Sequence, residues 1–145
     1  MCEQQNCPSA TVLMMDDDGR ILAACREILE HGGYRVLVAR DGGEGMDIFR
    51  EQHEDIDVVI MDWIMPGIDG HHWIGPLLAT DPDTKLIFCT GYVLNEAVLG
   101  ELNAKGVELL KKPFDAHQLL GAVERALGTE QAAEPAALGR EGTGG

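Results

Sequence analysis

The sequence contains five short runs rich in Val, Ile and Leu, and each is followed by a segment with helical spacing of its apolar residues. Such runs are typical of strands that are buried on both faces of a parallel sheet. Strict alternation of strand and helix predicts an α/β domain: a doubly wound, five-stranded parallel sheet with five helices. The expected strands are residues 11–15, 35–39, 58–61, 85–90 and 107–110.

The helices between these strands follow from apolar spacing and from capping residues. Apolar residues at 21, 22, 25, 28 and 29 form one helical face, which the pair Gly32-Gly33 terminates. Asp41 is expected to cap a helix that ends near Gln52, although nearby glycines weaken its first turn, and Asp115 caps the last helix. Inward positions are expected at Met46, Phe49, Leu94, Ala97, Val98, Leu102, Leu119, Leu120, Val123 and Leu127.

The third helix is the least regular. It begins with His71 and His72, but Gly75-Pro76 lies inside it. Proline removes a backbone hydrogen bond and clashes with the preceding turn. We therefore expect a kinked or late-starting helix that ends near Thr80.

The 145 residues fit a flexible leader over 1–10, one folded domain over 11–127 and a disordered tail over 128–145. A net charge of −14 with only 11 basic residues argues against direct nucleic-acid binding. No stretch approaches the roughly 18 apolar residues that a membrane span requires. Cys25 and Cys89 are predicted to be buried thiols, and Cys2 and Cys7 free thiols in a cytoplasmic, reducing compartment.

Polar residues follow four of the five predicted strands. Asp16 and Asp17 follow the first, Asp62 the third, Thr90 ends the fourth and Lys112 follows the fifth. In the flavodoxin-like strand order 2-1-3-4-5, the first and third strands are neighbours and the ligand crevice opens between them. Three converging carboxylates need either raised pKa values or a bound cation, and an all-oxygen set suits Mg²⁺. Asp62 is then a candidate nucleophile of the aspartyl-phosphate type.

Each of these features has an ordinary structural interpretation when taken alone. Three aspartates after a strand often form a turn or a helix cap, the Lys111-Lys112 pair can be solvated, and Thr90 before Gly91 can be a turn. Their joint placement at strand ends favours a functional site. His71 and His72 point in different directions on a helix, so surface histidines are favoured over a second metal site.

With these motifs in place, the sequence resembles the receiver domain of two-component response regulators over roughly residues 11–127. The resemblance rests on Met15-Asp16-Asp17-Asp18, on the segment from Met61 to Gly70, on Thr90-Gly91-Tyr92 and on Lys112-Pro113-Phe114. It implies a signalling protein rather than an enzyme, in which Asp62 accepts a phosphoryl group from a histidine kinase or a histidine phosphotransfer protein.

The resemblance also implies a ligand set. Mg²⁺ would be held by Asp17 and Asp62, by Asp16 through water and by the backbone carbonyl of Ile64. Thr90 and Lys112 would sense the phosphate, and the bond before Pro113 would be cis.

Three positions depart from the family pattern. Leu109 stands where many receivers carry a Tyr or Phe that follows the threonine, so the usual aromatic switch is missing. Tyr92 is interpreted as a loop residue rather than a substitute for it. Ile64 often has a polar counterpart, and an apolar side chain there could slow attack by water. Gly75-Pro76 leaves the third helix irregular.

The leading hypothesis is a phosphorylation-dependent switch, without an output domain in this chain, whose last two helices and fifth strand bind a downstream effector protein. A phosphorelay intermediate or a fragment of a hybrid histidine kinase is the first alternative. A Mg²⁺-dependent phosphatase with an Asp nucleophile is another, although Ile64 stands where its general acid would lie. A receiver-like module that is never phosphorylated, and a homodimer through the last helices, also remain open.

Overall fold

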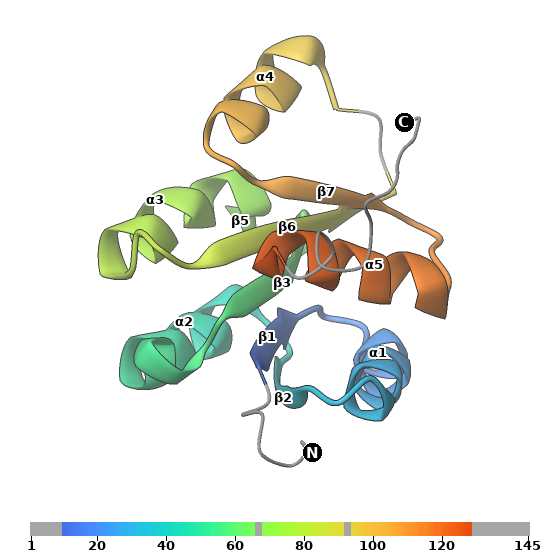
Figure 1. The fold of residues 1–145 in the computed structure, drawn as a ribbon. Coiled ribbons are helices and arrows are strands. Elements are labelled where there is room, and N and C mark those ends of the chain that lie inside the picture. Colours follow the sequence, from blue (N-terminus) through green and yellow to red (C-terminus); the bar gives the residue numbers. More distant parts are fainter. Residues whose placement is uncertain (1–9, 66–67, 92–93, 129–145) are drawn as a thin grey trace.

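The computed structural model describes residues 10–65, 68–91 and 94–128. Its centre is a five-stranded parallel sheet in the order β2-β1-β3-β6-β7, which confirms the predicted order 2-1-3-4-5 (Figure 1). The Val-rich and Ile-rich runs form these strands because both of their faces are covered by helices. The strands are β1 (Thr11–Met15), β2 (Arg35–Ala39), β3 (Val58–Asp62), β6 (Lys85–Thr90) and β7 (Glu108–Lys111).

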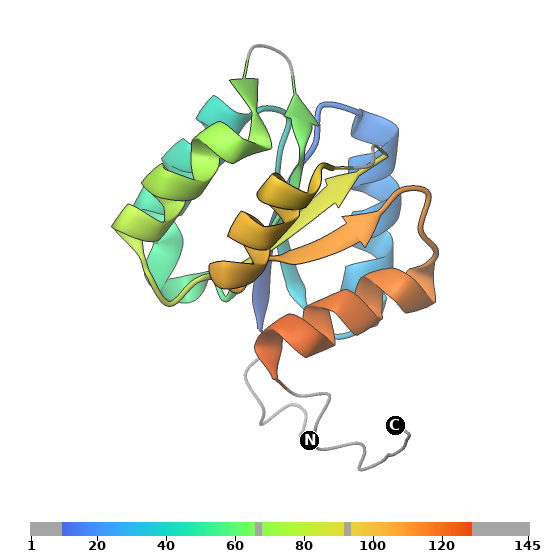
Figure 2. The same ribbon diagram turned by 90° about the horizontal axis from the view of Figure 1, so that it is seen from above.

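Helices cover both faces of this sheet. Two of them lie on one face, namely α1 (Gly19–His31) and α5 (Ala116–Leu127), as Figures 1 and 2 show. The other three lie on the opposite face, namely α2 (Gly42–Gln52), α3 (Gly70–Thr80) and α4 (Glu96–Ala104). A 3-10 turn, η1 (His53–Asp55), joins α2 to the third strand of the chain.

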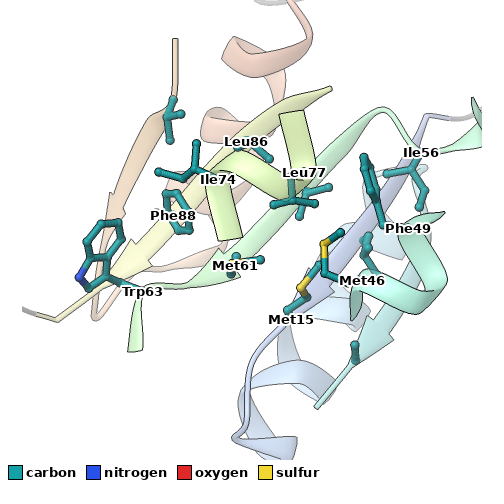
Figure 3. Close-up of a cluster of buried hydrophobic side chains, with 14 of the residues drawn as sticks. Met15, Met46, Phe49, Ile56, Met61, Trp63, Ile74, Leu77, Leu86 and Phe88 are labelled. Carbon is teal, nitrogen blue, oxygen red and sulfur yellow. The ribbon is translucent and has the colours of Figure 1, made fainter. Parts of the chain in front are cut away.

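The period of two along each strand divides the core into two clusters. In β1, Val12 and Met14 pack under α1 and α5, whereas Leu13 and Met15 pack under α2 and α3. Figure 3 shows the second cluster, in which Met15 lies beside Met46. The sheet is thus held from both sides, which fixes the positions of its strand ends.

Side-chain caps set the helix ends. The Asp41 carboxylate accepts the Glu44 amide at 2.7 Å, as predicted, and Asn95 caps α4 in the same way. Asp115 and Gln118 form a reciprocal capping box at α5. Gly33 and Gly106 adopt positive φ angles of 96° and 73°, which ends the turns after α1 and α4 at low steric cost.

Of the two alternatives predicted for the third helix, a kink or a late start, the late start is wrong. Helix α3 begins at Gly70 and continues through Pro76 to Thr80, the end that the sequence predicted. Ile74 and Leu77 on either side of the proline are 2% and 0% exposed. Their burial against the sheet compensates for the hydrogen bond that proline removes.

Two other details differ from expectation. Ala97 was predicted to face inward but is exposed, and Leu94 precedes α4 while still packing on the core. A short antiparallel pair, β4 (Ile64–Met65) and β5 (Ile68–Asp69), was not predicted. Strands of two residues leave no periodic pattern in a sequence, so pattern analysis does not find them.

Two of the glycines at the start of α2 are needed for packing. A Cβ on Gly42 would lie 2.5 Å from the Trp73 ring, and one on Gly45 would overlap the Met15 side chain. These contacts offset the poor helix propensity of glycine, and they bring α2 close to Trp73 of α3 and to Met15 at the end of β1.

Several expectations lie outside the described residues. They concern the leader before residue 10, the tail after residue 128, and Tyr92. Within the part of the chain that the structure describes, no helix is long and apolar enough to cross a membrane.

Candidate functional site

Three aspartates meet where β1 and β3 end. The two strands are paired in parallel, with Met15 opposite Met61, so the residues that follow them lie side by side. One carboxylate oxygen from each of Asp16, Asp17 and Asp62 lies within 4.8 Å of the other two. Asp16 is 1% exposed and Asp17 is exposed to solvent. The cluster therefore combines a buried carboxylate with one that solvent can reach.

Lys112 supplies the positive charge of this cluster. Its Nζ lies 3.0 Å from Asp16 Oδ2 and 3.3 Å from Asp62 Oδ2. The Lys112 amide donates to the Thr90 carbonyl at 2.8 Å, which continues the β6–β7 pairing by one residue. The peptide bond between Lys112 and Pro113 is cis.

Thr90 lies at the carboxyl end of β6, on the other side of Asp62. Its side chain is buried, with the residue 4% exposed. Strand β6 pairs with β3 so that Cys89 lies opposite Asp62, and the Cys89 carbonyl accepts the Trp63 amide at 2.8 Å. Thr90 therefore follows directly along the same edge of the sheet.

The electrostatics of Asp62 are unfavourable without a further cation. Burial, and after it the charge of Asp16, raise the pKa of Asp62, although Lys112 opposes them. Burial alone would lower the pKa of Lys112, but its bonds to Asp16 and the charge of Asp62 outweigh burial and raise it. One ammonium group thus serves two carboxylates and leaves negative charge uncompensated.

The two described cysteines lie near this cluster and are buried, as predicted. Burial, and then the charge of Asp16, raise the pKa of the Cys25 thiol to about 11. Burial raises the pKa of Cys89 to about 12. Both residues are protonated apolar contacts at neutral pH rather than nucleophiles.

The donor set fits a hard divalent cation. All three nearby side chains offer carboxylate oxygens, and Mg²⁺ prefers oxygen ligands together with retained waters. Ile64 lies beside the cluster with 48% of its surface exposed, and its amide is 3.4 Å from Asp62 Oδ1. The role of its carbonyl as a ligand remains a prediction.

The helix-cap interpretation of the three aspartates holds for Asp18, which caps α1 because its Oδ1 accepts a hydrogen bond from the Arg20 amide at 2.9 Å. Arg40 is a feature of this edge that was missed in the sequence. The Arg40 guanidinium donates to the Asp17 carbonyl from Nε at 3.3 Å and from Nη2 at 3.2 Å. The position of Arg40 directly after β2, the neighbour of β1, is a signal that could have found it.

The remaining predicted positions lie away from the carboxylates. Leu109 is partly buried and packs on the cluster that contains Trp63 and Phe88, and it lies opposite Phe88 in the sheet. His72 is exposed and contacts the Trp73 ring edge-on. Among the described residues, the only group of three or more ligand side chains is the aspartate cluster. The side chain of His71 lies outside the described residues.

Fold and site together define a doubly wound α/β domain with an acidic cluster at the carboxyl edge of its sheet, and comparison with known proteins gives the family. The family model for the response regulator receiver domain matches residues 12–124. The chain belongs to this family of two-component signalling domains and has its flavodoxin-like fold.

Similar proteins include both long and short ones. The sensor kinase CckA of Brucella abortus is 35% identical over 120 residues, which are 82% of this chain and 13% of CckA. Protein CcdB of Bacillus subtilis is 34% identical over 122 residues, which are 81% of this chain and 97% of CcdB. A receiver domain from Clostridium thermocellum has a TM-score of 0.76 at 30% identity, covering 86% of this chain and 99% of that domain.

Proposed function

We propose that this chain is a phosphorylation-dependent switch in which Asp62 accepts a phosphoryl group from a phosphohistidine. The donor would be a histidine kinase or a histidine phosphotransfer protein in the cytoplasm. One observation carries the proposal: three carboxylates from two strand ends gather within 4.8 Å, with Lys112 bound to two of them.

The chemistry is a transfer between two nucleophiles. A carboxylate oxygen of Asp62 attacks phosphorus, the new P–O bond forms as the P–N bond breaks, and the electron pair returns to the imidazole nitrogen. The attacking group must be ionised. Because burial and Asp16 raise the pKa of Asp62, additional positive charge at the cluster would favour the reactive form.

Mg²⁺ held by Asp16, Asp17, Asp62 and the Ile64 carbonyl would supply that charge and offset the charge on the phosphoryl oxygens. Lys112 would exchange the Asp62 carboxylate for a phosphoryl oxygen while it keeps its bond to Asp16. The Thr90 hydroxyl would donate to another phosphoryl oxygen. Thr90 ends β6, the strand next to β3, and Lys112 follows β7, the edge strand beyond it. Contacts from these two residues would therefore couple the phosphate to the β7 edge of the sheet.

A partner protein can approach Asp62 over an apolar surface. A cavity of about 470 Å³ opens beside Lys112 between α1 and the start of α5, and it is lined by Ile21, Ala24, Cys25, Ile28, Lys112, Pro113 and Phe114. Apolar contact with a phosphodonor protein there would orient its histidine. The effector would bind a different surface, formed by α4, β7 and α5. Leu109 lies in β7, at the position where many receivers carry the aromatic switch residue.

Similarity to CckA supports a second candidate, a receiver that belongs to a hybrid histidine kinase or a phosphorelay. This role uses the same chemistry at Asp62 but passes the phosphoryl group on to a second histidine. Transfer from phosphorylated Asp62 to a histidine phosphotransfer protein would favour this role. The phosphatase alternative has less support, because the side chain of Ile64 offers no proton to a leaving group.

The test is phosphorylation by a small-molecule donor. Purified protein is incubated with acetyl phosphate and Mg²⁺, and its intact mass is measured over time. We expect one added phosphoryl group in wild type and none in Asp62→Asn. Asp47→Asn is the matched control, because Asp47 is an exposed carboxylate on α2. An adduct that persists in Asp62→Asn, or none in wild type, would refute the proposal.

A further inference from the structure

The three consecutive aspartates after β1 are anchored in three different ways. Asp16 is held by its own side chain, which accepts the Asp18 amide at 2.9 Å and the Lys112 ammonium at 3.0 Å. Asp18 is held by capping α1. Asp17 is held through its backbone carbonyl, which accepts two guanidinium donors of Arg40. The exposed carboxylate of Asp17 is therefore left to face the cluster.

Arg40 is itself fixed to the first turn of α2. Its backbone amide donates to Glu44 Oε1 at 2.9 Å, and the Glu44 amide donates to Asp41 Oδ1 at 2.7 Å. One residue further on, Gly45 packs directly on Met15, the last residue of β1. The guanidinium also lies over Gly19, whose absent Cβ would be 3.3 Å from Nη1. This chain of contacts leads from the core to the loop that carries Asp17.

We propose that Arg40 is a positioning residue: it holds the Asp17 backbone so that the Asp17 carboxylate points toward Asp16 and Asp62, and it thereby strengthens cation binding. Fixing the backbone of one residue in advance removes an entropic cost that would otherwise fall on binding. This inference rests on the proposed metal site. It adds a residue from the β2–α2 connection to a site otherwise built from β1, β3, β6 and β7.

The direction in which cation affinity changes when Arg40 is removed distinguishes a positioning role from a purely electrostatic one. The Arg40 guanidinium is a positive charge near a cation site, so by Coulomb's law its removal would tighten cation binding. Positioning predicts the reverse, because a loosened loop must be ordered again when the cation binds. Residues that orient ligands from the outer shell of a metal site contribute about tenfold or more to affinity.

The experiment is a Mg²⁺ titration followed by the amide NMR signals of Asp62 and Trp63. We expect the Kd of Arg40→Ala to rise about tenfold over wild type. Arg40→Lys should recover part of the loss, because a lysine can make one of the two hydrogen bonds. Arg26→Ala is the matched control: Arg26 is an exposed arginine on α1 that pairs with Glu30 at 3.1 Å, and its loss should leave the Kd unchanged.

A second measurement uses metal-free protein. Amide hydrogens of residues 17–20 should exchange faster in Arg40→Ala than in wild type, while those of β3 stay protected. If wild type binds Mg²⁺ and the Kd of Arg40→Ala is unchanged or lower, the role of Arg40 is overturned while the metal site stands. Wild type that shows no Mg²⁺-dependent shift at Asp62 would overturn the proposed metal site and this inference together.

Discussion

The two edges of the central sheet carry the same residue type in opposite electrostatic states. At the amino edge, two aspartates have their own donors: Asp57 Oδ2 accepts a hydrogen bond from the Thr11 amide at 2.9 Å, and Asp81 lies 3.2 Å from His53 Nδ1. The hydrogen bond from His53, followed by that from the Asp83 amide, lowers the pKa of Asp81. At the carboxyl edge, Asp16 and Asp62 share Lys112, and the pKa of Asp62 is raised.

This difference separates carboxylates whose charge is satisfied within the fold from carboxylates whose charge is not. A carboxylate with its own donors is satisfied, and its ionised form contributes to folding. Carboxylates that compete for one ammonium retain an uncompensated charge, which a ligand cation or a changed protonation state can relieve. Both edges are built from strand ends and turns, so the arrangement of donors, rather than the composition, distinguishes them.

The largest effect is expected from removing the shared cation. Lys112→Ala leaves Asp16, which is 1% exposed, without its ammonium partner, and breaking such a buried pair is costly. We expect the free energy of unfolding, measured by urea denaturation at neutral pH, to fall by about 2 kcal/mol, a value reduced because Lys112 is partly exposed. Added Mg²⁺ should restore part of this loss. Lys111→Ala is the control, and an equal loss there would contradict the prediction.

A smaller effect of opposite sign is expected at Asp62. Its folded-state pKa lies above the ordinary value of 3.8, so the stability it contributes is present below that value and is lost as pH rises through the folded pKa. Asp62→Asn should therefore raise the melting temperature of the metal-free protein at neutral pH by a few degrees. The gain should vanish in acid, below the ordinary aspartate pKa. A melting temperature lowered at neutral pH would show that Lys112 compensates fully for the charge.

The amino edge should give the smallest change. The folded-state pKa of Asp81 is lowered, so its contribution is present above the ordinary value and is lost as pH falls through the folded pKa. Asp81→Asn should lower the melting temperature slightly at neutral pH, and the deficit should shrink in acid. Measuring both substitutions under the same conditions tests the comparison directly. If Asp62→Asn and Asp81→Asn shift the melting temperature at neutral pH in the same direction, the distinction between the two edges is wrong.

The sheet and the site were predictable for one reason. Buried parallel strands leave continuous apolar runs, and the polar residue that ends each run must lie at the edge of the sheet. The strand ends alone therefore place Asp16, Asp62, Thr90 and Lys112 at one edge.

What the sequence did not predict depends on contacts between distant segments. Arg40 bonds to a backbone carbonyl, which carries no side-chain signal. The glycines of α2 are weak helix formers by propensity, and the contacts with Trp73 and Met15 that require two of them leave no signal in the sequence. Ala97 fitted the apolar spacing of α4, but the face it occupies is exposed. Spacing identifies a helical stripe but does not show how far a neighbouring element covers it.

The contact between Gly45 and Met15 also limits how the protein could be engineered for greater heat resistance. Replacing a helical glycine by alanine usually raises the free energy of unfolding by about 0.5–1 kcal/mol, because the unfolded chain loses conformational entropy. Gly100 on α4 would accept the methyl group, since nothing lies within 4 Å of the added carbon. At Gly45 the same methyl group would push α2 away from β1 and shift the carboxyl edge of the sheet, where the aspartate cluster lies. A stabilising glycine-to-alanine substitution is therefore better placed at Gly100 than at Gly45.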